Sequence, residues 1–359
     1  MPDLANHRLH SLGISQQFHD TAEDVTRWMG AMQAQNYQQA LWAIGLRTKS
    51  LRLVDVKNEI ADAKIVRTWS QRGTIHFVPA EDTKWMLDLC ASRIVAGHGR
   101  RMSQLKLTEK DIAQCENLLL TALSDKTVMT RSAIFDLFEA NGVRTIGQRG
   151  YHIVWHLAHH GVICMGAMDG KEQTFVLLDD WVSNLRNFSR DEALVELVWR
   201  YFASHGPATD YDFARWSGLT LTDTRNGLAE NDFRLISFEH EENTYWMADN
   251  PQQIASHHEV HLLPAFDEYL LGYKDRSAVL PDENADKVVP GNNGVFQPLI
   301  VVDGQVVGIW KYKIKTTSID ITLHPFIELG DTQDELFQKA ENYADFLGLS
   351  LGKISVEHD

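Results

Sequence analysis

The stretch "RDEALVELVWRYFASHGPATDYDFARWSGLTLTDTRNGLAENDFRLISFEHEENTYWMA", residues 190–248, decides the fold. It contains three segments of helical periodicity and then two apolar runs that are typical of strands. The expected helices are 190–206, 209–218 and 220–231, and the expected strands are 233–239 and 244–248. Thr220 opens "TLTD", a serine/threonine-x-x-acid capping box. Three helices followed by a two-stranded hairpin indicate a winged helix, a helix-turn-helix with a β-ribbon appended.

The same order of elements occurs twice more in the chain. In the middle, the expected helices are 108–123, 130–140 and 150–161, and the strands are 162–168 and 174–180. At the start, the expected helices are 21–35, 39–47 and 52–66, and a hairpin covers 66–82. We therefore predict three tandem winged-helix units.

The pattern changes after residue 251. Residues 295–326 alternate between apolar and polar, with Asp303-Gly304 as a hairpin turn, and 332–349 reads as an amphipathic helix. The predicted fold class is α+β: three tandem winged-helix units, a small antiparallel β-domain and a C-terminal helix. The predicted domains are 1–105, 106–185, 186–250 and 251–359.

Composition limits the classes of function. The net charge is −15, but residues 1–110 carry 15 Lys+Arg against 11 Asp+Glu, a net of +4. A phosphate backbone could be bound by this first third, although scatter in surface charge explains the excess equally well. Three widely spaced cysteines argue against a disulfide framework or a zinc site. The start has no apolar signal segment, and no run approaches the roughly 20 apolar residues of a membrane span, so we expect a cytoplasmic protein.

Five stretches carry a resemblance to a known family: "MQAQN" (32–36), "VRTWSQRGTIHFVPAED" (66–82), "YFASHGPATDYDFARWSGL" (201–219), "HLLPAFDEYLLGYKDRS" (261–277) and "GQVVGIWK" (304–311). In this order they resemble the AlkZ-like winged-helix DNA glycosylases over nearly the whole chain. The resemblance implies monofunctional excision of N7-alkylated purines, including bulky adducts and interstrand cross-links. It also implies a glutamine–apolar–glutamine catalytic motif, which Gln33-Ala34-Gln35 matches.

Two neutral amides can carry this chemistry because an N7-alkylpurine is already cationic and leaves easily. Gln33 and Gln35 would hold a water under C1′ and direct it, which is catalysis by orientation. Positions i and i+2 of a regular α-helix lie about 200° apart, so both side chains reach one water only if the helix ends or distorts at the motif. Solvated helix positions are the structural alternative for both glutamines.

Two further groups are candidates for binding DNA or the lesion. On the first hairpin, Arg67 or Arg72 would contact phosphate, and His76 would line the pocket or donate to the DNA backbone. Trp69 is a further candidate for DNA or lesion binding, and packing against the helices is the structural alternative for Trp69 and His76. In the second half, we expect Asp267 and Tyr273 near the site and Arg276 in a structural or phosphate-facing role.

No cofactor or metal site is expected. His257, His258 and His261 surround Glu259, but "HHEVH" lacks the spacing of the HExxH zinc motif. The expected partner is duplex DNA carrying alkylated purines. We expect the protein to act as a monomer and not to associate with a membrane. Two alternatives remain open: a non-catalytic winged-helix DNA-binding or regulatory protein, and a winged-helix interaction module without a DNA role.

Overall fold

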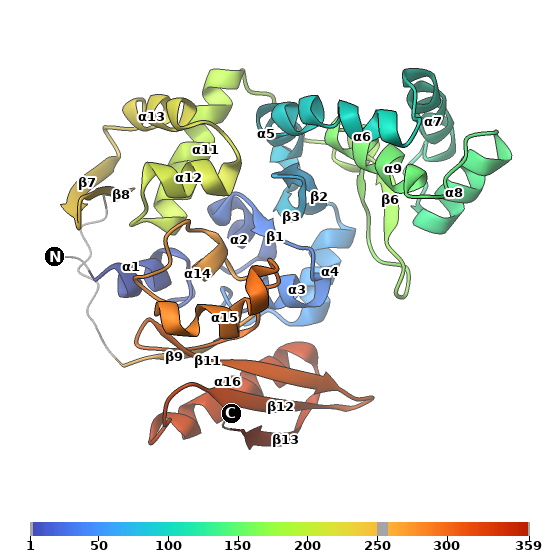
Figure 1. Ribbon diagram of the computed structural model, residues 1–359. Helices are drawn as coiled ribbons and strands as arrows, with labels where there is room; N and C mark the ends of the chain where they lie inside the picture. Colours follow the sequence, from blue (N-terminus) through green and yellow to red (C-terminus); the bar gives the residue numbers. More distant parts are fainter. Residues whose placement is uncertain (1–2, 250–257, 358–359) are drawn as a thin grey trace. The chain divides into compact units, whose positions relative to one another are not determined.

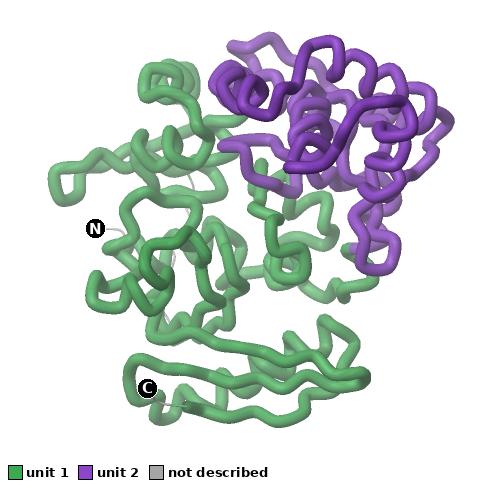
Figure 2. Tube along the Cα trace, turned by 45° about the vertical axis from the view of Figure 1, so that its right-hand side comes forward, with its two compact units in different colours: residues 1–56, 197–359 green, residues 57–196 purple. Residues whose placement is uncertain are grey.

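The computed structural model describes residues 3–249 and 258–357, and the chain forms two compact units (Figures 1 and 2). The first unit combines residues 1–56 with 197–359, and the second unit is residues 57–196. The unit boundaries fall within two helices, α4 (Leu53–Ala61) and α11 (Arg190–His205). No helix in the described ranges is long and apolar enough to cross a membrane.

The unit boundaries do not coincide with the expected domain boundaries at 105/106 and 185/186. The expected boundary at 250/251 lies outside the described residues. Division into four domains therefore stays a prediction.

The second unit is built around a sheet in which neighbouring strands are antiparallel, in the order β3-β2-β5-β6-β4. Its strands are β2 (Ile65–Gln71), β3 (Thr74–Pro79), β4 (Met129–Thr130), β5 (Ile163–Met165) and β6 (Thr174–Leu177). Its helices are η1 (Ala80–Asp82), α5 (Thr83–Gly97), α6 (Gly99–Gln104), α7 (Glu109–Ala122), α8 (Arg131–Ala140), α9 (Arg149–His159) and α10 (Leu178–Trp181). A core that includes Trp69, Phe138, Ile153 and Phe175 joins the helices to the sheet.

The predicted order of three helices and two strands is confirmed over 108–178, where α7, α8 and α9 precede β5 and β6. The start of α7 follows from a capping box. The backbone N–H of Asp111 donates to Oγ1 of Thr108 (3.1 Å), and the carboxylate of Asp111 accepts from the N–H of Thr108 (2.9 Å). At the start of the chain the expected third helix, 52–66, is wrong at its end, because α4 stops at Ala61 and β2 begins at Ile65.

The first unit contains the other repeat. Its helices are α1 (Leu4–Ser11), α2 (Ala22–Met29), α3 (Tyr37–Gly45), α12 (Asp210–Ser217) and α13 (Leu221–Ala229), and the hairpin is β7 (Leu235–His240) with β8 (Asn243–Ala248). α11, α12 and α13 therefore precede a hairpin, as predicted. The capping box at Thr220 is confirmed: its Oγ1 accepts from the N–H of Asp223 at 3.0 Å.

The C-terminal part of the first unit contains a sheet in the order β13-β12-β11-β10-β9. Its elements are β9 (Val260–Leu263), α14 (Glu268–Leu271), η2 (Asp282–Asn284), α15 (Ala285–Val288), η3 (Pro290–Asn292), β10 (Leu299–Val302), β11 (Gln305–Ile314), β12 (Ser318–Pro325), α16 (Thr332–Leu347) and β13 (Ser350–Val356). The Asp303-Gly304 turn is confirmed, with φ of 49° and 78° between Val302 and Gln305.

One prediction about this sheet is wrong. We expected an antiparallel domain closed by a helix, but β13 follows α16 and pairs with β12 in parallel. The α16 crossover explains the direction, because a parallel pair needs a long connection between its strands. Trp310 and Tyr343, both fully buried, join the sheet to α16 with ring centroids 5.1 Å apart.

Candidate active site

The glutamine motif lies between two helices and not within one. α2 ends at Met29, where Gly30 has φ 73° and ψ −58°. The N–H of Ala31 donates to the carbonyl of Met29 (2.9 Å), which closes a three-residue γ-turn. Glycine suits this turn because other residues are strained at such a φ. The chain then continues as the short strand β1 (Met32–Gln33), and α3 begins at Tyr37.

The sequence-based helix over 21–35 is therefore wrong in its last six residues, and the geometric condition set by the motif is met. The strand ends at Gln33 and the chain bends at Gln35, so the two side chains are not separated as in a helix. Nε2 of Gln33 donates to Oε1 of Gln35 at 3.4 Å, while Ala34 between them is fully buried. Gln33 is only 9% exposed, whereas Gln35 is exposed. Gln33 is thus enclosed by the protein, and Gln35 is accessible from outside.

A buried carboxylate supports this segment. The backbone N–H of Gln33 donates to Oε1 of Glu268 at 3.1 Å, and Nε1 of Trp216 donates to Oε2 at 3.1 Å. Nε2 of His205 lies 3.6 Å from the same Oε2. Glu268, His205 and Trp216 are all buried, and burial lowers the pKa of His205 although Glu268 raises it. The motif is therefore anchored to α11, α12 and α14 of its own unit.

The neighbour of this carboxylate has a different partner. Asp267 forms a buried bidentate ion pair with Arg47, with Oδ2–Nη1 and Oδ1–Nη2 distances of 2.9 and 2.8 Å. Arg47 also donates to the carbonyls of Leu12 (2.8 Å) and Ala43 (2.9 Å). Asp267 further accepts from the N–H of Tyr269 (2.9 Å) and so caps α14. This geometry fixes the start of α14, where Glu268 is the first residue.

The other predicted residues of this unit lie as follows. Tyr273 is fully buried; its hydroxyl donates to the carbonyl of His205 (2.7 Å), and its ring lies 3.8 Å from the guanidinium carbon of Arg8. Arg276 is half-buried, donates from Nε to the carbonyl of Leu270 (2.8 Å) and covers the ring of Phe296. Tyr273 thus lies beside the His205 backbone, and Arg276 stays partly accessible.

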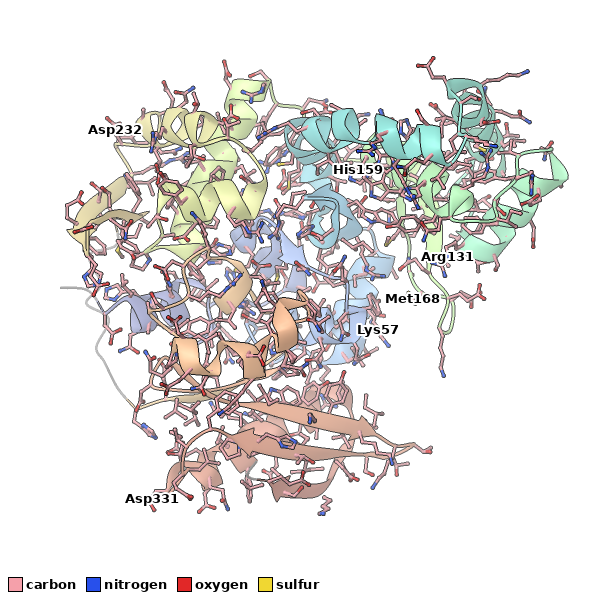
Figure 3. All side chains as sticks on the ribbon, in the orientation of Figure 1. Lys57, Arg131, His159, Met168, Asp232 and Asp331 are labelled. Atoms are coloured by element: carbon pink, nitrogen blue, oxygen red, sulfur yellow. The ribbon has the colours of Figure 1, made fainter. Side chains whose placement is uncertain are left out.

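The four predicted hairpin residues belong to the second unit. Arg67 is buried and donates to the side-chain amide of Gln173 (2.5 Å). Trp69 is buried in the core and stacks with His159, with ring centroids 6.4 Å apart; Figure 3 labels His159. Arg72 is half-buried and lies 3.3 Å from Nε2 of the fully buried His76. Burial holds the pKa of His76 well below its usual value, and the charge of Arg72 lowers it further. His76 is therefore neutral at pH 7.

The described histidines around residue 259 pair with carboxylates. Nδ1 of His258 lies 2.9 Å from Asp303, and Nε2 of His261 lies 2.9 Å from Glu259. His257 lies outside the described residues. Among the residues that the structure describes, no group of three or more histidine, cysteine or carboxylate side chains is arranged to hold a metal ion.

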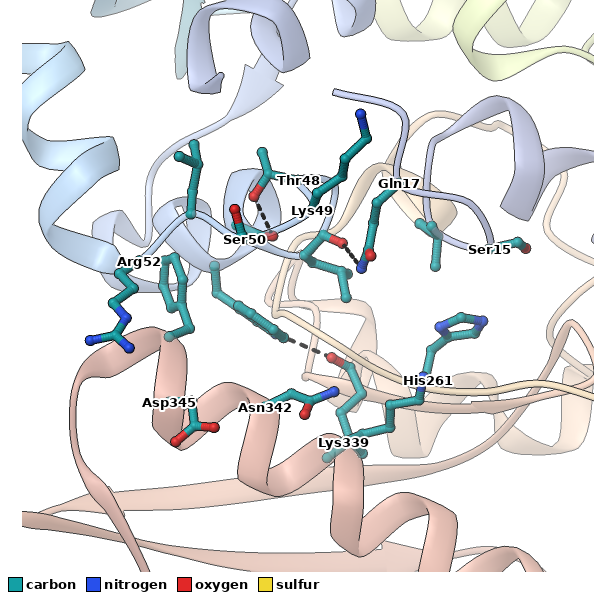
Figure 4. A pocket seen from close by; sticks show the side chains of 17 residues that line it. Ser15, Gln17, Thr48, Lys49, Ser50, Arg52, His261, Lys339, Asn342 and Asp345 are labelled. Atoms are coloured by element: carbon teal, nitrogen blue, oxygen red, sulfur yellow. Dashed lines mark hydrogen bonds between the residues drawn. The ribbon is translucent and has the colours of Figure 1, made fainter. Parts of the chain in front are cut away.

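A separate pocket of about 390 Å³ lies in the first unit, and neither Gln33 nor Gln35 lines it. Lys49, Arg52 and Lys339 contribute positive charge to its lining (Figure 4). Trp42 also lines the pocket. The indole N–H of Trp42 donates to the carbonyl of Leu262 at 3.2 Å. This bond joins α3 to β9 beside the pocket.

Sequence reasoning did not assign roles to Glu268, His205 and Trp216. All three lie in stretches that carry the family resemblance, "YFASHGPATDYDFARWSGL" and "HLLPAFDEYLLGYKDRS". The signal available in the sequence was the acid pair Asp267-Glu268, because the side chains of two consecutive residues can face different partners. Gln33 and Glu268 are 235 positions apart in the sequence, and this separation concealed which of the two carboxylates meets the motif.

The chain is similar to known DNA glycosylases. Residues 26–346 match the family model described as DNA glycosylase AlkZ-like. The chain is 26% identical over 312 residues to an interstrand DNA cross-link repair glycosylase of Streptomyces sahachiroi, covering 81% of this chain and 82% of the relative. The solved structure of the Streptomyces sahachiroi DNA glycosylase AlkZ superposes with a TM-score of 0.81 at 24% identity, over 99% of this chain and 98% of that one. The structural likeness establishes the fold.

Proposed function

The chain belongs to the AlkZ-like DNA glycosylase family, and from this premise we propose that it hydrolyses the N-glycosidic bond of cationic N7-alkylpurines in duplex DNA. The observation that carries the mechanism is the 3.4 Å separation of Gln33 Nε2 and Gln35 Oε1, which lie between the two helices where the backbone is not helical. Because the similar Streptomyces protein is named for interstrand cross-link repair, we include bulky adducts and cross-links among the proposed substrates.

In the proposed reaction, the bond between C1′ and N9 breaks and its electron pair neutralises the cationic purine. A water oxygen bonds to C1′ and gives up a proton to the solvent, so the products are a neutral alkylpurine, an abasic site and a released proton. The leaving base carries its own electron sink, which is why neither a strong general acid nor a cofactor is required. The enzyme's task is to hold the water and stabilise the oxocarbenium-like sugar.

The two amides suit this task. Each amide oxygen has two lone pairs, so Oε1 of Gln35 can accept from Gln33 and from a water at the same time, while Oε1 of Gln33 accepts the second water proton. The Gln33 contact orients the Gln35 oxygen before substrate binds. Carbonyl dipoles aimed at C1′ then stabilise the developing positive charge. A catalyst without an ionised group at the water is expected to act on cationic lesions and to leave neutral bases intact.

We further propose that the two observed runs of three helices and a hairpin, α7–β6 and α11–β8, are winged-helix units, and that residues 1–105 form a third. The matching order of elements supports this division. Among the predicted DNA contacts, Arg72 and Arg276 are the two cations that stay partly accessible, and we propose that both meet phosphate. Arg67, Trp69, His76, Asp267 and Tyr273 are buried, so we propose that they support the DNA-binding surface from within the protein.

A duplex with one N7-methylguanine tests the proposed function. Release of the base leaves an abasic site that alkali converts to a strand break, and we expect wild-type release without breaks before alkali, which is the outcome for a monofunctional enzyme. Gln35→Ala should lower the single-turnover rate by about 100-fold and leave the Kd for duplex within a few-fold. Tight, salt-dependent duplex binding with no release from any cationic lesion would instead describe a non-catalytic DNA-binding protein.

A further inference from the structure

The carboxylate of Glu268 joins three segments of the first unit that are distant in sequence. It accepts from the backbone N–H of Gln33 through one oxygen and from Trp216 Nε1 through the other, at 3.1 Å each. His205 Nε2 approaches the second oxygen at 3.6 Å. The side chain of Glu268 is 1% exposed and that of His205 is fully buried. A buried carboxylate costs free energy unless it is paired, so this arrangement is expected to have a specific purpose.

We propose that Glu268 is the positioning residue of the glutamine motif, resting on the glycosylase function proposed above. Its oxygen holds the peptide that precedes the Gln33 side chain, at the point where the chain has just left the Gly30 turn. A displacement of this peptide moves the Gln33 amide and therefore the Gln35 oxygen that Gln33 orients. Glu268 acts through these amides and does not itself touch the substrate.

The surroundings fix the carboxylate in turn. The indole N–H of Trp216 donates to Glu268. The hydroxyl of Tyr201 donates to the carbonyl of Gly272 (2.6 Å), and the hydroxyl of Tyr273 donates to the carbonyl of His205 (2.7 Å). The ring of Tyr201 stacks on His205, with centroids 4.6 Å apart and an angle of 13° between the planes. A Cβ on Gly272 would lie 2.7 Å from Cδ2 of His205 and 2.6 Å from the carbonyl oxygen of Glu268, so this close packing depends on glycine.

The position of each partner explains why a carboxylate is needed. The N–H groups of Gln33 and Trp216 are both donors, so the group between them must accept on both sides. Glutamine accepts only through its oxygen and would leave one buried donor opposed by an NH₂ group. Glu268→Gln preserves the volume, and it should release either Gln33 or Trp216. The matched control is Glu259→Gln, since Glu259 is a carboxylate of the same unit that accepts from Ser15 Oγ and pairs with His261, both at 2.9 Å.

The first test measures single-turnover release of N7-methylguanine, the Kd for the same duplex and the thermal midpoint. We expect Glu268→Gln to release the base about 10- to 100-fold more slowly than wild type, with a Kd within about threefold, because misplacement of catalytic groups lowers the rate more than binding. Trp216→Phe should give a smaller loss, since the Gln33 contact survives. Glu259→Gln should match wild type. A folded Glu268→Gln protein that releases the base at the wild-type rate overturns the assignment.

A double-mutant cycle separates positioning from a general structural role. If Glu268 acts through Gln33, then Glu268→Gln combined with Gln33→Ala should lose no more activity than Gln33→Ala alone. Losses that multiply would overturn the assignment, because the carboxylate would then act independently of Gln33.

A second readout does not depend on activity. Hydrogen–deuterium exchange of the peptide covering 31–36 should be faster in Glu268→Gln than in wild type and unchanged in Glu259→Gln. Unchanged exchange in Glu268→Gln overturns the assignment. A wild type that releases no base disproves the proposed function alone, and the exchange experiment still decides whether Glu268 holds the motif.

Discussion

The Arg47–Asp267 pair gives the sharpest test of what the acidic residues beside the motif do. Asp267 is a predicted lesion contact, yet its carboxylate makes two hydrogen bonds of 2.8 and 2.9 Å to Arg47, and the two side chains are 0% and 1% exposed. Asp267→Asn keeps the shape and removes the charge. An asparagine can accept from only one arm of the guanidinium and presents an NH₂ group to the other.

The magnitude follows from burial. Removing one partner of a buried ion pair leaves the other charge uncompensated and costs about 3–5 kcal/mol. In a unit of roughly 200 residues, a loss of about 4 kcal/mol lowers the thermal midpoint by roughly 12 °C. Arg47 keeps its bonds to Leu12 and Ala43, so the protein should still fold at low temperature. There we expect the duplex Kd to stay within a few-fold of wild type.

Urea unfolding and calorimetry measure the stability change, and duplex titration at low temperature measures binding. The control is Asp20→Asn, which removes the exposed pair of Lys49 and Asp20 (2.9 Å; 52% and 73% exposed) and should cost less than about 1 kcal/mol. An Asp267→Asn protein of wild-type stability that binds lesion DNA tenfold more weakly would refute the structural reasoning and support direct recognition.

Three further predictions concern the turn, the histidines and the lesion. Gly30→Ala should destabilise the protein by about 1–3 kcal/mol in urea unfolding, because φ of 73° strains an alanine, and should slow base release; Gly97→Ala, in the helix α5 with open space around it, should be neutral or stabilising. Burial lowers the pKa of His159 to about 4, so the folded state binds fewer protons than the unfolded state below pH 6.5. The contribution of His159 to the free energy of unfolding should therefore fall as pH drops from about 6.5 towards 4, by at most about 1.4 kcal/mol per pH unit, and His159→Gln should make the measured slope shallower by that contribution. The wild type should release N7-methylguanine and leave an oligonucleotide with the neutral lesion uracil intact; equal rates on both would contradict catalysis by neutral amides.

Local patterns in the sequence predicted much of the fold, because their causes are local. The capping box at Thr220 and the Asp303-Gly304 turn were both correct, since each depends on side chains and backbone preferences within a few residues. The γ-turn at Gly30 was missed because "WMGAMQAQ" has helix-forming residues on both sides of one glycine. The final strand was missed because "SLGKISV" gains its stability from pairing with β12, which the local sequence does not reveal.

The candidate site divides in the same way. The motif and the acidic pair could be found from the sequence, but the burial of each side chain could not. Asp267 and Tyr273 were expected near the site, and both are buried in the structure. Which of two adjacent carboxylates meets Gln33 depends on how α14 starts, and that start depends on the Arg47 partner of Asp267. Long-range pairing of this kind follows from the packed structure and not from spacing.

The non-helical backbone of the motif also gives its two glutamines unequal roles. Gln33 is buried, and its backbone N–H donates to Glu268. Gln35 is exposed, and its side-chain oxygen accepts from the Gln33 amide. A helix would have separated the two side chains and exposed or buried each according to its face. The turn from strand to bend instead lets the buried Gln33 amide bond the exposed Gln35 amide, so that the first orients the oxygen of the second before substrate arrives. Two weak polar groups can therefore act as one preorganised acceptor, and their chemistry depends more on the backbone between Gly30 and Tyr37 than on the acidity of either side chain.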